Sequence, residues 1–148
     1  MLTTFTRLLT NFVIYITFFS RAVLYIKING EVGEVKVMIR SITRKELKEK
    51  LDHNVKMRLV DIRMRDSCEI EHIKGAMCVP FNELVESAGR MFNKNEEVIV
   101  YCGSNRCADS PAAAKLLESR GFKKVFEFDG GLEDWKGAKY PVETSRLK

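Results

Sequence analysis

Short apolar runs alternate with helix-forming segments along most of the chain after residue 43. The clearest run is Val98-Ile-Val-Tyr101, because it is β-branched and aromatic and is bounded by polar residues on one side and Gly103 on the other. This alternation is typical of an α/β fold with a mainly parallel sheet covered by helices on both faces. Four strands are predicted, near Arg58–Ile62, Met77–Val79, Glu97–Tyr101 and Lys124–Phe128.

Capping residues predict where the helices between these strands begin and end. Thr43 and Glu46 form a capping box ahead of a helix over Arg44–Leu51, and Asn82 is predicted to cap a short helix over Glu83–Ala88. Ser110 followed by Pro111 predicts a helix start, and Gly121 predicts the end of that helix.

Cys102 comes directly after the strongest strand and just before one of the predicted helices. A helix N-terminus and a nearby cation lower the pKa of a cysteine and favour the nucleophilic thiolate, and Arg106 supplies such a cation. The same environment attracts an anionic substrate. A reactive Cys102 is therefore predicted, and the alternative is an inert buried cysteine at a strand end.

Five short segments, in order and in register over residues 42–141, resemble the rhodanese-like domain. No segment is decisive alone, but their combined spacing is specific. They are Leu59–Arg63, His72–Ala76, Tyr101–Cys102, Gly121–Val125 and Asp129–Trp135.

The resemblance implies a three-layer α/β sandwich and a sulfurtransferase that moves sulfane sulfur from a donor such as thiosulfate to a thiophilic acceptor. Cys102 would carry the sulfur as a persulfide. Asp61, Arg63 and His72 would give structural support to the loops, and His72 is less suited to act as a general base. The backbone amides that would cradle the sulfur belong to Gly103, Ser104, Asn105, Arg106 and Cys107.

The length of the loop separates two reaction classes found on this fold. Relatives that hydrolyse phosphate monoesters have an arginine six positions after the cysteine, whereas Arg106 comes four positions after Cys102. The shorter loop favours sulfur transfer over phosphatase or arsenate-reductase chemistry. Many thiosulfate-using members have arginine five positions after the cysteine, where this chain has Cys107, so the donor stays open.

The other three cysteines have different predicted roles. Cys107 is either a resolving thiol that attacks a persulfide on Cys102 and leaves a disulfide, or a small apolar residue beneath the loop. Cys78 lies in an apolar segment and is expected to pack in the core, and Cys68 is expected in a loop. Because no Cys-x2-Cys pair occurs, no metal and no other cofactor are predicted.

The composition of the chain restricts the classes of binding partner but does not identify a specific one. A chain of 148 residues with 45% hydrophobic and 30% charged residues is one ordinary globular domain by size, and its net charge of +5 is too mild and dispersed to predict nucleic-acid binding. A small anionic sulfur donor and a sulfur-acceptor protein are the expected partners. The alternative function is a non-catalytic or redox-switch module that uses the Cys102/Cys107 thiol pair.

Residues 1–37 precede the resemblance and have three interpretations, whereas residues 38–148 form the predicted domain. The apolar stretch over residues 8–28 suggests a membrane anchor, which would leave the catalytic domain cytoplasmic, or a cleaved signal segment. The Asn29-Gly30 pair between two apolar runs instead predicts a β-hairpin. A mis-assigned start, with Met38 as the true first residue, is the third interpretation.

Overall fold

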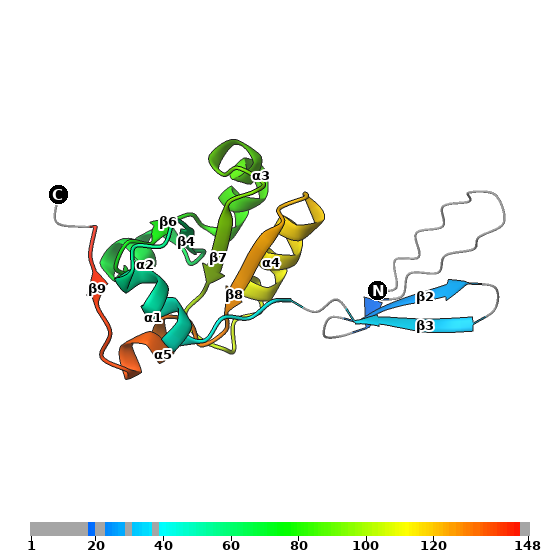
Figure 1. Cartoon of the computed structure of the whole chain (residues 1–148), viewed down its shortest axis with the longest axis horizontal. Helices are drawn as coiled ribbons and strands as arrows, with labels where there is room; N and C mark the ends of the chain where they lie inside the picture. The colour runs from blue at the N-terminus through cyan, green and yellow to red at the C-terminus, as the bar shows by residue number, and fades with distance from the viewer. Residues whose placement is uncertain (1–17, 20–22, 29–30, 37–38, 146–148) are drawn as a thin grey trace. The chain divides into compact units, whose positions relative to one another are not determined.

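The computed structural model describes residues 18–19, 23–28, 31–36 and 39–145 (Figure 1). The chain divides into two compact units, Met1–Met38 and Ile39–Lys148.

The larger unit is built on a four-stranded parallel sheet in the order β6-β4-β7-β8. These strands are β4 (Arg58–Asp61), β6 (Met77–Cys78), β7 (Glu97–Tyr101) and β8 (Lys124–Phe128). The predictions for β7 and β8 are confirmed residue for residue, and β4 and β6 each end one residue earlier than predicted.

Helices cover both faces of this sheet, so the predicted three-layer α/β fold is confirmed (Figure 1). On one face α3 (Phe81–Met91) and α4 (Asp109–Ser119) share a core with Val98 and Val100 of β7. The opposite face carries α1 (Arg44–Asp52) and α5 (Gly131–Gly137), which share a core with Ile99 and Tyr101.

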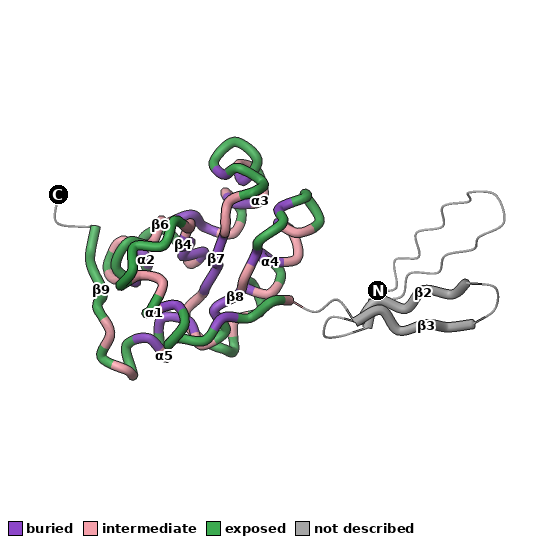
Figure 2. The backbone as a smooth tube through the Cα atoms, viewed as in Figure 1, coloured by how far each residue is buried: buried purple, intermediate pink, exposed green. Residues whose placement is uncertain are grey.

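The central strand β7 is buried on both faces, as a strand in the middle of a parallel sheet must be (Figure 2). Its residues Val98 to Tyr101 are fully inaccessible to solvent. Trp135 of α5, 1% exposed, lies at the same core, and its indole N–H donates to the carbonyl of Pro141 at 2.9 Å. The strand that precedes Cys102 is therefore held rigidly from both sides.

Two of the predicted helix ends are confirmed. The Thr43 hydroxyl accepts the Glu46 amide at 3.3 Å while the Glu46 carboxylate accepts the Thr43 amide at 2.9 Å, which is the predicted capping box at the start of α1. Gly121 ends α4 with φ of +86°. Its amide donates to the Glu118 carbonyl, and the next amide donates to Leu117, an arrangement that satisfies two carbonyls of the last turn.

Two predicted caps are wrong, because neither Asn82 nor Ser110 precedes its helix. Helix α3 starts at Phe81, before Asn82, and the Phe81 amide donates to the carbonyl of Ile62 at 3.1 Å. Helix α4 starts at Asp109, and the Ser110 hydroxyl donates to the buried carboxyl of Glu127 on β8 at 2.7 Å. The hydroxyl of Ser110 therefore serves a long-range contact instead of a cap.

Three short elements complete the larger unit. Helix α2 (Arg65–Ile70) connects β4 to β5 (His72–Ile73), and β5 pairs antiparallel with β9 (Val142–Glu143). The pairing matches His72 with Glu143, so it ties the C-terminal segment to the middle of the chain.

The smaller unit contains β1 (Phe18–Phe19), β2 (Val23–Ile28) and β3 (Glu31–Lys36). Strands β2 and β3 pair antiparallel from Val23 with Lys36 to Ile28 with Glu31, as the hairpin interpretation predicts. Among the residues that the structure describes, no helix has the length and apolar character to cross a bilayer. Within the predicted anchor over residues 8–28, Phe18–Phe19 and Val23–Ile28 form strands, and residues 8–17 and 20–22 lie outside the described residues.

Candidate functional site

Cys102 lies at the carboxyl end of β7, where the loop 102–108 leads into α4. It is half-buried and packs against the core shared by α3 and α4. Asp61 at the end of β4 is paired with Tyr101, so the ends of both strands lie at the same edge of the sheet. This edge is where ligands bind in open parallel α/β sheets.

Helix α5 supports the Cys102 loop from one side. The amide of Leu132 donates to the carbonyl of Cys102 at 3.0 Å, and the amide of Glu133 donates to that of Gly103 at 2.9 Å. Gly131, with φ of +62°, approaches so closely that a Cβ there would lie 2.6 Å from the Cys102 carbonyl oxygen. In the sequence, Gly131 belongs to the family-like segment Asp129–Trp135, and no local pattern there predicts this support of the Cys102 loop.

Inside the loop, two backbone amides donate to Ser104. The Cys107 amide donates to the Ser104 carbonyl at 3.1 Å, and the Arg106 amide donates to the Ser104 hydroxyl at 3.4 Å. The side chains of Asn105 and Arg106 are exposed, whereas Gly103, Ser104 and Cys107 are half-buried. The loop therefore closes on itself and presents the Arg106 guanidinium to solvent.

Cys102 and Cys107 are joined by a disulfide, with their Cα atoms 6.3 Å apart. A disulfide needs a Cα separation below about 7 Å, which is the condition that the sequence alone leaves open. In this form neither sulfur is a nucleophile. Reduction of this bond is required before Cys102 can act as a thiolate.

The buried Asp61 carboxylate forms an ion pair with half-buried Arg63. The Arg63 guanidinium donates to both Asp61 carboxylate oxygens, at 2.7 Å from Nη2 and 3.0 Å from Nε, and Nη2 also donates to the Glu71 carbonyl. Burial is the largest influence and acts to lower the pKa of Arg63, but the hydrogen bonds to Asp61 and the nearby negative charges together outweigh it, so the net pKa is raised. A Cβ on Gly103 would lie 3.7 Å from Arg63 Cδ, so the arginine stem borders the loop.

Tyr101 connects β7 to the neighbouring segment through its hydroxyl. Its oxygen accepts the Ile73 amide at 3.0 Å, and the residue is fully buried. Burial, and then the nearby Asp61 carboxylate, raise the pKa of this hydroxyl, so it stays protonated. The sequence predicted Tyr101 as a strand residue and as part of the family-like pair Tyr101–Cys102, but it did not predict the contact of this hydroxyl with Ile73.

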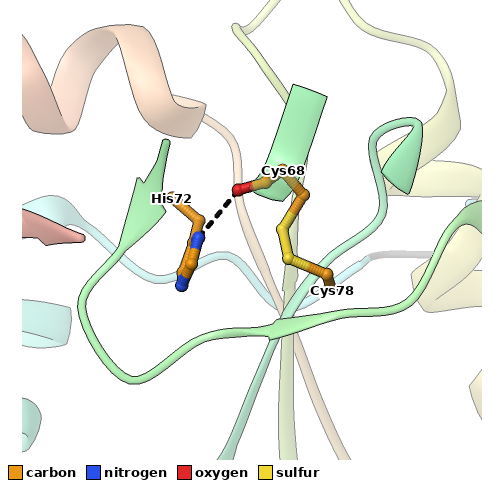
Figure 3. Close-up of side chains that lie close together, drawn as sticks. All are labelled: Cys68, His72 and Cys78. Atoms are coloured by element: carbon orange, nitrogen blue, oxygen red, sulfur yellow. Dashed lines mark hydrogen bonds between the residues drawn. A yellow bond between two sulfur atoms is a disulfide. The ribbon is translucent and has the colours of Figure 1, made fainter. Parts of the chain in front are cut away.

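His72 is 2% exposed and makes polar contacts at both ring nitrogens. Because the Cys68 carbonyl can only accept, Nδ1 carries the proton and donates to it at 2.7 Å (Figure 3). Nε2 lies 3.4 Å from the Glu143 carboxylate. These contacts hold the turn between α2 and β5.

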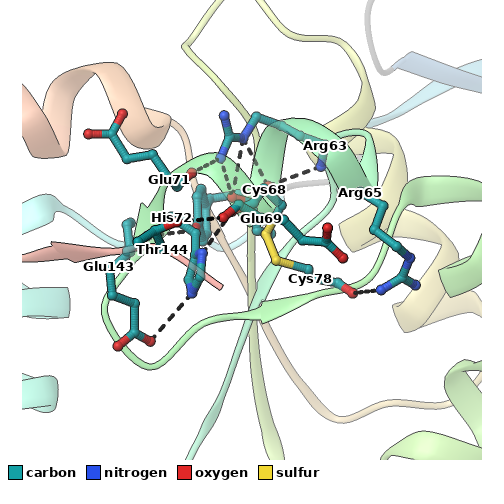
Figure 4. The surroundings of a disulfide bond; sticks show 12 residues. Arg63, Arg65, Cys68, Glu69, Glu71, His72, Cys78, Glu143 and Thr144 are labelled. Carbon is teal, nitrogen blue, oxygen red and sulfur yellow. Dashed lines mark hydrogen bonds and ion pairs between the residues drawn. A yellow bond between two sulfur atoms is a disulfide. The ribbon is translucent and has the colours of Figure 1, made fainter. Parts of the chain in front are cut away.

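A second disulfide joins Cys68 to Cys78, with Cα atoms 5.8 Å apart (Figure 4). The expected loop position of Cys68 is wrong, because this residue is fully buried in α2, and Cys78 is half-buried on β6 instead of simply filling the core. The packing of α2 against β6 brings the two together. All four cysteines of the chain are therefore paired.

Comparison with known proteins gives one consistent match. A family model described as Rhodanese-like domain matches residues 43–138. The chain is 33% identical over 99 residues to the putative sulfur carrier protein YrkF of Bacillus subtilis, covering 67% of this chain and 52% of that protein. It is 36% identical over 87 residues to thiosulfate sulfurtransferase GlpE of Coxiella burnetii, covering 59% of this chain and 78% of that protein.

Solved structures agree with the sequence comparisons. The solution structure of the rhodanese-like domain of the Anabaena protein Alr3790 matches with a TM-score of 0.65 and 31% identity, over 72% of this chain and 80% of that one. The chain spans about half the length of YrkF, 52% of it, so the similarity concerns one domain of that protein.

Proposed function

We infer that this chain, which belongs to the rhodanese-like domain family, is a sulfurtransferase that carries sulfane sulfur on Cys102. The observation that carries the proposal is the position of Cys102, half-buried at the carboxyl end of the central strand and in a loop whose carbonyls are fixed by α5. Names of relatives agree with it, since GlpE is a thiosulfate sulfurtransferase and YrkF a putative sulfur carrier.

The first half-reaction forms a persulfide. A dithiol reductant first transfers two electrons and two protons to the Cys102–Cys107 bond and becomes a cyclic disulfide. The Cys102 thiolate then attacks the outer sulfur of the donor. With thiosulfate, the S–S bond of the donor breaks, sulfite leaves with the electron pair, and Cys102 holds a persulfide anion. The amides of Arg106 and Cys107 donate to Ser104, so the amides of Gly103, Ser104 and Asn105, together with the N-terminus of α4, are the groups that stabilise this anion. The exposed Arg106 guides the anionic donor toward the loop.

The second half-reaction removes the outer sulfur. A thiolate of an acceptor protein, or cyanide in an assay, attacks the outer sulfur and regenerates the Cys102 thiolate. Cyanide leaves as thiocyanate, so the number of electrons on the protein is unchanged over the cycle.

A second candidate function follows from the Cys102–Cys107 disulfide. The Cys107 thiol can attack the inner sulfur of the persulfide, which releases hydrosulfide and forms the disulfide seen in the structure. In a module that only switches redox state, a mild oxidant forms this bond with no sulfane sulfur involved. The bond itself favours this candidate, because both sulfurs lie within bonding reach.

The two candidates differ in steady-state turnover. Reduced wild-type chain, Cys102→Ser and Cys107→Ser are compared for thiocyanate production from thiosulfate and cyanide. Sulfur transfer predicts turnover by wild type and by Cys107→Ser, and none by Cys102→Ser with an unchanged fold. Turnover by Cys102→Ser contradicts the persulfide mechanism, and no turnover by any form with several sulfane donors favours the redox switch.

A further inference from the structure

A second cluster of sulfur and nitrogen ligands lies outside the Cys102 loop, at Cys68, His72 and Cys78 (Figure 3). One candidate ligand atom of each residue lies within 4.8 Å of the other two. Cys68 is fully buried and His72 is 2% exposed. We propose that these three side chains bind a thiophilic divalent cation of the Zn²⁺ class when the Cys68–Cys78 disulfide is reduced.

The donor set suits such a cation. Two thiolates and one imidazole are the ligands that Zn²⁺ prefers, and hard cations such as Mg²⁺ or Ca²⁺ require oxygen instead. The three residues come from α2, β5 and β6, so the fold fixes their relative positions. The absence of a Cys-x2-Cys pair led to the prediction of no metal, whereas here a histidine lies between two cysteines that only the fold brings together.

The distance between the two cysteines allows their side chains to change from a disulfide to a pair of metal ligands without movement of the backbone. Tetrahedral coordination with Zn–S bonds of about 2.3 Å places two sulfurs about 3.8 Å apart. The Cα atoms of Cys68 and Cys78 are 5.8 Å apart, so rotation of the two short side chains accommodates that separation.

His72 contributes a ring nitrogen to the cluster, and one of its two ring nitrogens lies within 4.8 Å of a candidate ligand atom of both cysteines. Its Nδ1–H donates to the Cys68 carbonyl at 2.7 Å, so the ring is held beside the disulfide (Figure 3). Metal-binding histidines usually donate one ring N–H in this way, and the bond fixes the tautomer. Glu143 Oε1 lies 3.4 Å from Nε2 but is not one of the clustered ligand atoms, so a water molecule is expected at the fourth position (Figure 4).

Charge balance permits a metal at this buried position. Two thiolates neutralise a divalent cation, so with a neutral imidazole and a water molecule the loaded cluster is buried with no net charge from these groups.

Metal binding and the disulfide exclude each other. A dithiol reductant transfers two electrons and two protons to the Cys68–Cys78 bond and is itself converted to a cyclic disulfide. The cation then displaces the two thiol protons to solvent as it binds. The site therefore loads only in a reducing environment, and it shares no residue with the Cys102 loop, so its failure would leave the sulfur-transfer proposal intact.

Co²⁺ is the probe for this site, because thiolate–Co²⁺ coordination gives charge-transfer absorption and tetrahedral Co²⁺ gives strong visible bands. The full chain carrying Cys102→Ser and Cys107→Ser restricts any thiolate signal to Cys68 and Cys78. It is titrated in two forms, reduced with a phosphine and oxidised with the disulfide intact. Zn²⁺ competition then gives the affinity.

We expect one Co²⁺ per reduced chain, with thiolate charge-transfer absorption that Zn²⁺ abolishes, and no such absorption in the oxidised chain. Adding Cys78→Ser should weaken binding by at least about 100-fold, since loss of an outer-shell partner alone costs about 10–100-fold. His72→Gln should weaken it as well. His53→Gln is the matched control, because exposed His53 makes the same 2.7 Å Nδ1 contact to a backbone carbonyl.

Three results would overturn the proposal. One is a reduced chain without thiolate–Co²⁺ absorption, and another is equal binding by the oxidised and reduced forms. The third is equal loss with His53→Gln and His72→Gln. The comparison of the two redox forms needs no further substitution, so it stays decisive if His72→Gln fails to fold.

Discussion

Replacing Gly131 with Ala should destabilise the fold and displace the Cys102 loop. A Cβ at this position would lie 2.6 Å from the Cys102 carbonyl oxygen and 2.8 Å from Gly103 C and Ser104 N. Its φ of +62° also places an L-residue in the left-handed region. Backbone strain costs about 1–2 kcal/mol, and forcing an extra methyl group into a packed site adds about 1–3 kcal/mol.

We therefore expect Gly131→Ala to lower the free energy of unfolding by about 2–5 kcal/mol. Because the clash falls on the backbone of the Cys102 loop, the rate of persulfide formation should fall by about 10–100-fold, as expected for a misplacement of about 1 Å. Urea unfolding measures the first effect. Rapid mixing of reduced protein with thiosulfate, followed by mass analysis, measures the second.

Substitutions at two other glycines distinguish the effect of backbone strain from the effect of the steric clash. Gly75 has φ of +86° and nothing within 4 Å of a Cβ, so Gly75→Ala should show the strain of about 1–2 kcal/mol alone. Gly89 lies in α3 with nothing within 4 Å of a Cβ, so Gly89→Ala should be neutral or stabilising by up to about 1 kcal/mol. If Gly131→Ala matched Gly75→Ala in both stability and rate, the close approach of α5 to the loop would not matter and the reasoning would be refuted.

Three further substitutions test other parts of the structure. Tyr101→Phe leaves the buried Ile73 amide without its acceptor and should cost about 1–3 kcal/mol in urea unfolding; an unchanged unfolding midpoint would show that this bond contributes nothing. Burial raises the pKa of Glu127, so the wild type should lose stability as pH rises from the ordinary glutamate value through the raised one; Glu127→Gln should flatten this dependence in melts across pH, and an equally steep profile would contradict it. Replacing Cys68 and Cys78 together with Ala removes a disulfide that spans ten residues and should lower the stability of the oxidised chain by about 3 kcal/mol; equal stability would mean that the bond does not restrict the unfolded chain.

The sequence predicted elements whose information is local. The β-branched run before Cys102 is β7 itself, and the Thr43–Glu46 capping box and the Gly121 helix end depend on residues within a few positions of each other. The position of Cys102, the candidate nucleophile, at the end of a strand was predicted from the same kind of local pattern. A strand, a glycine and the start of a helix follow one another at this point of the sequence.

Features that depend on contacts between residues far apart in the sequence could not be predicted in this way. The Ser110 hydroxyl was assigned to a cap because the partner that takes it, Glu127, is 17 residues away on β8. Cys68 and Cys78 carry no pairing signal in their spacing, and only the packing of α2 against β6 joins them. Gly131 is one of nine glycines in the chain, and nothing local shows that it is the one lying against the Cys102 loop.

The most direct test of the central claim is the intact mass of the reduced chain after incubation with thiosulfate, measured for wild type, Cys107→Ser and Cys102→Ser. The account predicts a gain of one sulfur atom that cyanide removes, visible in Cys107→Ser even if Cys107 resolves the wild-type persulfide to the disulfide. Cys102→Ser should gain nothing. A cyanide-labile sulfur on Cys102→Ser, or none on Cys107→Ser with any sulfane donor, would contradict a persulfide carried by Cys102.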